Sequence, residues 1–228
     1  MFFISEIKCV IFDCDGVLVD SVSSWKTLHE HFGTENHGLL SKYLSGELTD
    51  QEFMNLDIKM WKSVQSNIHQ DDLFRVYSGV KLMPGAREVV SELISKGIFV
   101  AIVSAGVDVF VSTIAGLLKV NDWIANGFEF DEKGYLLDEG IVRVSGQGKG
   151  KIVKKLIEMH NFQASEVICI GDSEIDLSMN IEGTHFLGFN PSRETSFKAF
   201  KDADVPIIIE KDLRLIWKHI FPNTIFPN

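Results

Sequence analysis

Residues 8–16, with the sequence KCVIFDCDG, decide the fold of this 228-residue chain. Residues 8–12 are mostly apolar and β-branched and lack polar alternation, which is typical of a strand buried on both faces. The stretch runs directly into Asp13 and Asp15, which would share one face of an extended chain. A buried strand that ends in paired carboxylates predicts an α/β protein with a site at one edge of its sheet.

Further along the chain, other apolar stretches also end in polar residues. Residues 98–103 (IFVAIV) lead into a predicted turn at residues 104–106, and residues 167–170 (VICI) lead into Asp172, with Asp176 four positions later. Further strands are predicted at 184–189 and 205–209, and helices at 84–96, 108–118, 150–160, 175–182 and 212–220. This alternation predicts an α/β fold whose parallel sheet is flanked by helices. Because ligands bind outside the carboxyl ends of parallel strands, positions 13, 104 and 172 are expected to converge.

Residues 21–82 differ in character from the rest of the chain. They are rich in polar residues and contain no convincing strand, and Trp25, Leu28 and Phe32 follow helical spacing. We therefore predict a helical cap at 21–82, inserted into an α/β core formed by 1–20 and 83–228. Residues 127–144 alternate and turn at 131–134, which predicts a β-hairpin flap.

Composition narrows the function classes. With 22 basic and 32 acidic side chains the formal charge is −10, which disfavours nucleic-acid and anionic-membrane partners. The 45% hydrophobic content is ordinary for a soluble globular protein, and no apolar run is long enough to span a bilayer. Three cysteines without CxxC spacing argue against a disulfide framework or a zinc cage. We expect a cytoplasmic enzyme, without a signal peptide, that is a monomer or a homodimer.

The predicted site has the residue types that phosphoryl transfer needs. Crowded carboxylates raise one another's pKa unless a cation lies among them, and an oxygen-only ligand set favours Mg²⁺. Aspartate can act as a nucleophile toward a phosphoryl group, and a second aspartate can act as general acid and base. Ser104 and the backbone N–H groups after it would hold phosphate oxygens, and Lys149 would balance negative charge.

Four segments resemble the motifs of the haloacid dehalogenase superfamily of phosphatases and phosphomutases, in the order of that family. They are residues 13–21 (DCDGVLVDS), 103–106 (VSAG), 148–150 (GKG) and 171–179 (GDSEIDLSM). Residues 149–220 are most similar to the phosphoserine-phosphatase branch. The resemblance implies a Rossmann-like core with an inserted cap.

The resemblance also implies a role for each matching residue. Asp13 matches the nucleophile and a Mg²⁺ ligand, and Asp15 matches the acid/base, with its carbonyl also reaching the metal. Asp172 matches the remaining side-chain metal ligand, and Asp176 matches a supporting carboxylate, which we include in the metal group. The implied phosphate-binding group consists of Ser104, Ala105, Gly106 and Lys149. The implied substrate is a small phosphorylated metabolite, which would be hydrolysed through an aspartyl-phosphate.

The chain departs from the phosphoserine-phosphatase pattern where that branch recognises its substrate. The position of the cap glutamate falls on Val22, and no arginine precedes Arg75 to serve as the cap arginine. Ile175 stands where that branch has an asparagine. Substitutes for the cap cation would be lysines, namely Lys26, Lys42, Lys59 and Lys62. These departures leave the phosphate chemistry intact and the substrate open.

Several alternatives stay open at this point. The protein could be a phosphomutase like β-phosphoglucomutase, or a non-catalytic phosphate-binding protein. Lys149 and Lys151 compete for one role, Ser104 could be a helix N-cap, and Asp176 could be an exposed helical acid. The two cap histidines, His29 and His31, are expected on the surface.

Overall fold

A seven-stranded sheet forms the centre of the computed structural model, which describes residues 6–21, 23–191, 193–222 and 224–227. The strand order is β4-β3-β2-β1-β5-β6-β7. All neighbouring strands are parallel except the β3–β4 pair. The strands are β1 (Cys9–Phe12), β2 (Phe99–Val107), β3 (Asp122–Phe130), β4 (Leu136–Ile141), β5 (Val167–Gly171), β6 (His185–Phe189) and β7 (Ile207–Ile208). The predicted α/β fold is confirmed.

Both faces of the sheet are buried. In β1, Val10 and Phe12 belong to one apolar cluster, and Cys9 and Ile11 belong to another, as alternation along a strand requires. The first face packs against α5 (Ala86–Ser95), α6 (Asp108–Leu118), η3 (Leu213–Ile216) and α9 (Trp217–Ile220). The second packs against α7 (Lys149–His160), α8 (Glu194–Asp202) and η2 (Glu174–Met179), with the short η1 (Ala164–Glu166) before β5.

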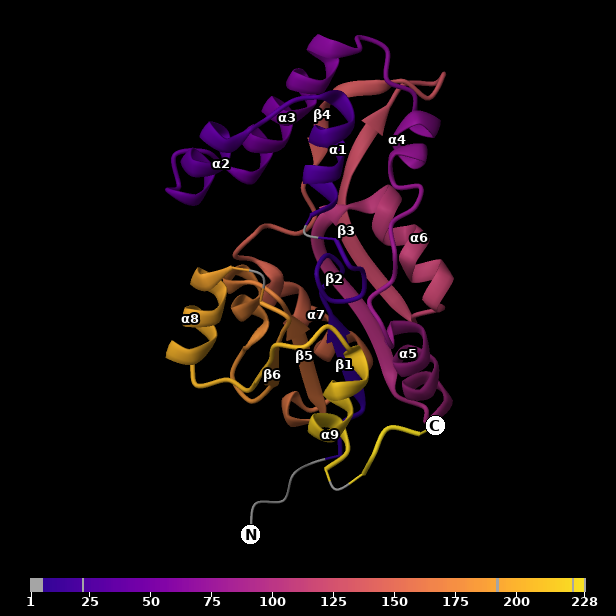
Figure 1. Cartoon of the computed structure of the whole chain (residues 1–228), viewed down its shortest axis with the longest axis vertical. Helices are drawn as coiled ribbons and strands as arrows, with labels where there is room; N and C mark the ends of the chain where they lie inside the picture. The colour runs from indigo at the N-terminus through magenta and orange to yellow at the C-terminus, as the bar shows by residue number, and fades with distance from the viewer. Residues whose placement is uncertain (1–5, 22, 192, 223, 228) are drawn as a thin grey trace.

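The described part of residues 21–82 is helical, as predicted. Its helices are α1 (Ser24–Phe32), α2 (His37–Leu44), α3 (Asp50–Val64) and α4 (Gln70–Val76). Figure 1 shows them gathered around the far ends of β3 and β4, at one end of an elongated molecule. The apolar side chains Leu28, Ile58 and Trp61 share a cluster with Phe128 and Leu136 of the hairpin. These helices and the hairpin therefore form one packed unit, while the division into a cap and a core stays a prediction.

Local structure differs from the sequence-based expectation at several places. The predicted turn at 104–106 is wrong, because β2 continues through these residues and pairs Val107 with Asn126 after a register shift. The predicted α-helix at 175–182 is the 3₁₀ helix η2. The parallel part of β3 and the whole of α8 were not predicted. Helix α8 buries only Ser196 and Phe200, so its apolar periodicity is too weak to detect.

The histidine pair of α1 divides between interior and surface. His31 is exposed as expected, but the surface prediction for His29 is wrong, because only 4% of this residue is exposed. Its Nε2 lies 3.2 Å from Asp57, and its Nδ1 is 3.2 Å from the Trp61 indole nitrogen. Among the described residues no helix is both long enough and apolar enough to cross a membrane.

Candidate active site

A pocket of about 150 Å³ opens at the carboxyl ends of β1, β2 and β5. Every residue that the sequence analysis placed in the site lines this pocket: Asp13, Asp15, Ser104, Ala105, Gly106, Lys149, Asp172 and Asp176. The other lining residues are Ser23, Trp25, Ser173, Ile175 and Arg193. The predicted convergence of positions 13, 104 and 172 is therefore confirmed as geometry.

The loop after β1 depends on a glycine. The Asp13 amide donates to the Ile170 carbonyl of β5 at 2.9 Å, so the strand pairing extends up to the site. Gly16 then adopts a positive φ of 77°, and a Cβ there would lie 2.4 Å from Asp172 Oδ2. Because only glycine tolerates both the conformation and the contact, Gly16 allows the loop to approach Asp172.

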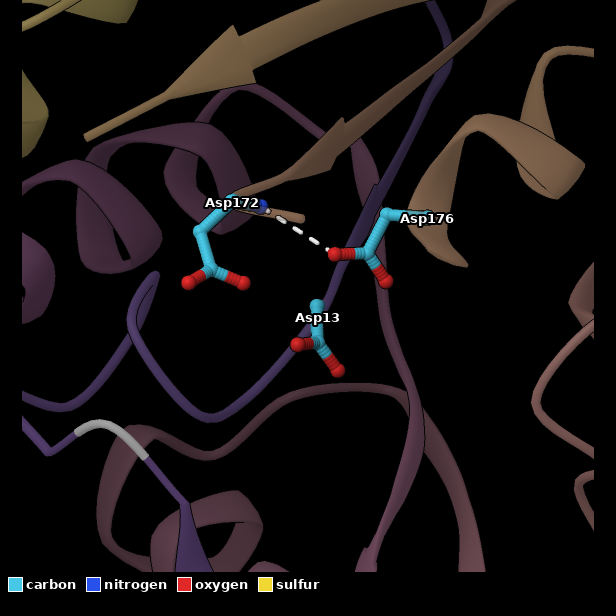
Figure 2. A group of neighbouring side chains, drawn as sticks. All are labelled: Asp13, Asp172 and Asp176. Atoms are coloured by element: carbon cyan, nitrogen blue, oxygen red, sulfur yellow. Dashed lines mark hydrogen bonds between the residues drawn. The ribbon is translucent and has the colours of Figure 1, made fainter. Parts of the chain in front are cut away.

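Three buried carboxylates meet at the base of the pocket. Asp13, Asp172 and Asp176 each offer an oxygen within 4.8 Å of the others, and Figure 2 shows the three side chains gathered close together. Asp176 Oδ2 accepts hydrogen bonds from the Asp172 amide at 3.2 Å, the Ser173 amide at 3.0 Å and the Ser173 hydroxyl at 2.8 Å. Asp176 is thus a fixed interior group, and its interpretation as an exposed helical acid is wrong.

Burial shifts two of these acids, Asp13 and Asp172, toward protonation. Burial raises the pKa of Asp13 to about 7 and outweighs the opposing effect of Lys149, while the charges of Asp176 and Asp15 add smaller increases. Burial also raises the pKa of Asp172 to about 9, again with contributions from Asp176 and Asp13. A divalent cation would relieve this repulsion, and a site with only oxygen donors fits Mg²⁺.

Lys149 supplies positive charge inside the pocket. It begins α7, is only 2% exposed, and donates to Asp13 Oδ1 at 2.8 Å and to Asp176 Oδ1 at 2.5 Å. Burial lowers its pKa, but the two carboxylates outweigh this effect and raise the pKa above its ordinary value. Lys151 lies on the exposed face of the same helix. The structure therefore brings Lys149, and not Lys151, to the acids.

Asp15 is held by Ser24, a residue that the sequence analysis did not identify. Asp15 Oδ2 accepts hydrogen bonds from the Ser24 amide at 3.0 Å and the Ser24 hydroxyl at 2.7 Å. Its other oxygen, Oδ1, is buried and accepts no hydrogen bond from the described residues. Burial raises the pKa of Asp15, although the two bonds from Ser24 lower it. A carboxyl with one fixed and one free oxygen is suited to carrying a proton.

The segment after Val103 is extended and rigidly held. The Ser104 hydroxyl accepts a hydrogen bond from the Gly106 amide at 3.1 Å, and Val107, not Ser104, occupies the N-cap of α6. The Ala105 carbonyl accepts from the Trp25 indole N–H at 3.0 Å. A Cβ at Gly106 would lie 2.6 Å from the Ser24 hydroxyl and 2.8 Å from Asp15 Oδ2. Ser104 thus faces the pocket, and the prediction that it caps a helix is wrong.

Arg193 is a charged lining residue that the sequence analysis did not identify. It precedes α8 and follows the carboxyl end of β6. Ligands bind outside the carboxyl ends of parallel strands, and residues 184–189 were predicted as such a strand. The same rule that selected positions 13, 104 and 172 could therefore have identified Arg193.

The cap cations considered from the sequence lie elsewhere. The pocket lining includes neither Arg75 nor any of the four lysines, namely Lys26, Lys42, Lys59 and Lys62. Arg75 pairs with Asp72, and Lys62 pairs with Asp138. Val22, the position matching the cap glutamate, lies outside the described residues.

Comparison with known proteins agrees with this geometry. A model of the haloacid dehalogenase-like hydrolase family matches residues 7–183. A phosphoserine phosphatase of Methanocaldococcus jannaschii is 26% identical over 216 residues, which cover 93% of this chain and 97% of that protein. A phosphoserine phosphatase of Archaeoglobus fulgidus is 25% identical over 185 residues, 78% of this chain, and the match spans only 51% of that protein.

A solved structure supports the same fold. The phospho-aspartyl intermediate analogue of a phosphoserine phosphatase superimposes with a TM-score of 0.77 at 22% identity, over 95% of this chain and 100% of that one. At this identity the likeness concerns the fold alone. Since the family model covers most of the sequence, the chain belongs to the haloacid dehalogenase-like hydrolases.

Proposed function

We propose that this hydrolase is a Mg²⁺-dependent phosphatase that releases phosphate from a small phosphorylated metabolite through an aspartyl-phosphate on Asp13. The proposal is supported by the convergence of five side chains in one pocket: Asp13, Asp15, Ser104, Lys149 and Asp172. The phosphoserine phosphatases to which the chain is similar favour the same reaction class.

Asp13 and Asp172 are the side chains proposed to hold the metal. The Asp172 carboxylate makes no hydrogen bond with the described residues, and Asp13 uses only Oδ1, toward Lys149. Both oxygens of Asp176 already accept hydrogen bonds, which suits a supporting carboxylate, and its direct contact with the ion stays a prediction. Bound Mg²⁺ would supply positive charge that keeps the carboxylates ionised and screens them from the phosphate.

The reaction needs two transfers of the phosphoryl group. A carboxylate oxygen of Asp13 attacks phosphorus, while Asp15 donates a proton to the leaving oxygen of the substrate. Asp15 then takes a proton from water, whose oxygen attacks the phosphoryl group and frees Asp13. Ser104 and nearby amides would hold the phosphate oxygens, and Lys149 would balance the charge that develops on them.

A phosphomutase would use the same first transfer to Asp13. It would then return the phosphoryl group to the same intermediate after that intermediate has turned around in the site. The family match and the phosphoserine-phosphatase relatives favour hydrolysis, so the mutase is the less favoured reading of the same site. A non-catalytic phosphate-binding role is also disfavoured, because the proposed nucleophile and metal acids are all present.

Phosphate release from a panel of small monoesters, with and without Mg²⁺, tests the proposal. We expect release that depends on Mg²⁺, and we expect Asp13→Asn to lower turnover by about 10⁴-fold or more, since it removes the nucleophile. Asp20→Asn is the matched control, because Asp20 is an exposed acid of the same loop that pairs with Lys211. Full activity of the Asp13 variant, with a normal circular dichroism spectrum, would exclude Asp13 as nucleophile.

A further inference from the structure

Arg193 is a cation at the rim of the pocket. Its guanidinium makes no hydrogen bond or ion pair with any residue in the described ranges. An arginine carries its charge at all physiological pH values and offers five donors in a planar fork. The side chain is therefore available to a molecule that enters the pocket.

The charges of the pocket make Arg193 different from Lys149. Lys149 is already bonded to Asp13 and Asp176, and its charge is committed to the acids at the base. Among the described lining residues, Arg193 is the remaining cation. A negative group outside the phosphate position would thus find its countercharge at Arg193.

Contacts at the start of α8 fix the place of Arg193. Glu174 of η2 accepts hydrogen bonds from the Ser196 hydroxyl at 2.5 Å and the Thr195 hydroxyl at 3.3 Å. Because both carboxylate oxygens of Glu174 accept hydrogen bonds from α8, Glu174 holds the start of this helix beside Arg193 and forms no ion pair with the guanidinium.

The other rim residues limit the size and polarity of the ligand. The volume of about 150 Å³ is well below the roughly 300–1,000 Å³ typical of sites for drug-sized ligands. Trp25 and Ile175 supply apolar walls, so they offer no charge to a substrate. A substrate that fills this space has only a few carbon atoms between the phosphate and the rim.

From this arrangement we infer that Arg193 selects phosphate esters that carry a carboxylate a few bonds away from the phosphate. The inference rests on the proposed phosphatase function and names its substrate class, a small phosphorylated carboxylic acid. The planar guanidinium fork matches the two oxygens of a carboxylate, which gives geometric selectivity as well as charge.

A pair of matched substrates tests Arg193. 3-Phosphoglycerate has a carboxylate at the position where glycerol 3-phosphate has a hydroxymethyl group. Phenyl phosphate serves as a third substrate that reports general phosphatase activity. We expect the wild-type protein to prefer 3-phosphoglycerate in kcat/KM. We expect Arg193→Gln to lower the ratio of the two kcat/KM values by on the order of 10- to 100-fold, since a charge-assisted hydrogen bond is lost. Arg193→Lys should give an intermediate ratio because it keeps the charge without the fork.

Lys198→Gln is the matched control, because it removes one positive charge from an exposed position of α8 that does not line the pocket. It should leave the substrate ratio unchanged. The inference is overturned if wild-type protein hydrolyses phenyl phosphate without preferring the carboxylate ester, if Arg193→Gln keeps the ratio, or if Lys198→Gln changes it equally. Absence of phosphate release from all three esters would instead overturn the proposed function itself, and the selectivity with it.

Discussion

The base of the pocket comes from the ends of sheet strands, the first turn of α7 and Asp176 of η2, whereas the rim comes from α1, Ile175 of η2 and the segment before α8. At the base, Asp13, Asp172, Asp176 and Lys149 are each at most 7% exposed, and their hydrogen bonds cross between elements. On the rim, Trp25 is half-buried and Arg193 is exposed. The base is thus fixed by the sheet, while the rim can change without rebuilding it.

This contrast separates reaction from selection. The base has the groups that any phosphate ester needs, and the rim has the groups that meet the rest of the substrate. Changes at the base should lower turnover of every ester, whereas changes at the rim should alter the relation between esters. The following experiments test that separation, beginning with the largest expected effect.

Lys149→Ala should lower kcat by on the order of 10²- to 10³-fold for every ester tested, because the charge opposite the phosphoryl oxygens is lost. Lys151→Ala is its matched control, since Lys151 lies exposed one half-turn away on α7, and it should stay within about twofold of wild type. Phosphate-release kinetics on two unlike esters measure both variants. A loss confined to one ester would place Lys149 with the selective rim and would break the contrast.

Ser24→Ala should lower kcat by about tenfold, because Asp15 loses a hydrogen bond to one oxygen of a buried carboxylate. The bonds from Ser24 lower the pKa of Asp15, so this variant should move the Asp15 titration in the kcat–pH profile upward. Ser24→Thr keeps a hydroxyl and should restore much of the loss. Ser41→Ala, at an exposed position of α2, should leave the profile unchanged. An unshifted profile in Ser24→Ala would show that Ser24 does not act through Asp15.

Metal binding should change stability by a smaller amount that depends on pH. The pKa values of Asp13 and Asp172, about 7 and about 9, lie above the ordinary value of 3.8, so the folded state binds more protons than the unfolded state. Stability of the metal-free protein should therefore fall as the pH rises from about 4 toward 9. Added Mg²⁺ should raise Tm by about 4 °C or more near pH 8 and by less near pH 5, where protons compete.

Thermal unfolding in EDTA and in Mg²⁺ measures this difference. Asp172→Asn should remove most of the Mg²⁺ effect, whereas the control Asp122→Asn, an acid at the start of β3 that does not line the pocket, should keep it. An equal rise in Tm at both pH values would contradict binding by the crowded carboxylates at the base.

Sequence determined the base of the site because strand ends carry a local signal. Buried apolar runs that give way to polar residues at Asp13, Ser104 and Asp172 have a pattern visible within a few residues, and parallel packing brings these positions to one edge of the sheet. The same signal placed β1, β5 and β6 nearly at their observed bounds. The hairpin turn was also visible, since Gly134 adopts a positive φ of 83° there.

Tertiary structure alone decided which neighbours those groups have. The choice of Lys149 over Lys151 depends on how α7 meets η2, where a Cβ at Gly150 would lie 2.2 Å from the Ser178 carbonyl. The contacts of Ser24 with Asp15 and of Trp25 with Ala105 join segments that no periodicity relates. Arg193 reaches the pocket because β6 ends beside β5 and η2 anchors α8. Such contacts arise from packing between distant segments, and a local pattern carries no record of them.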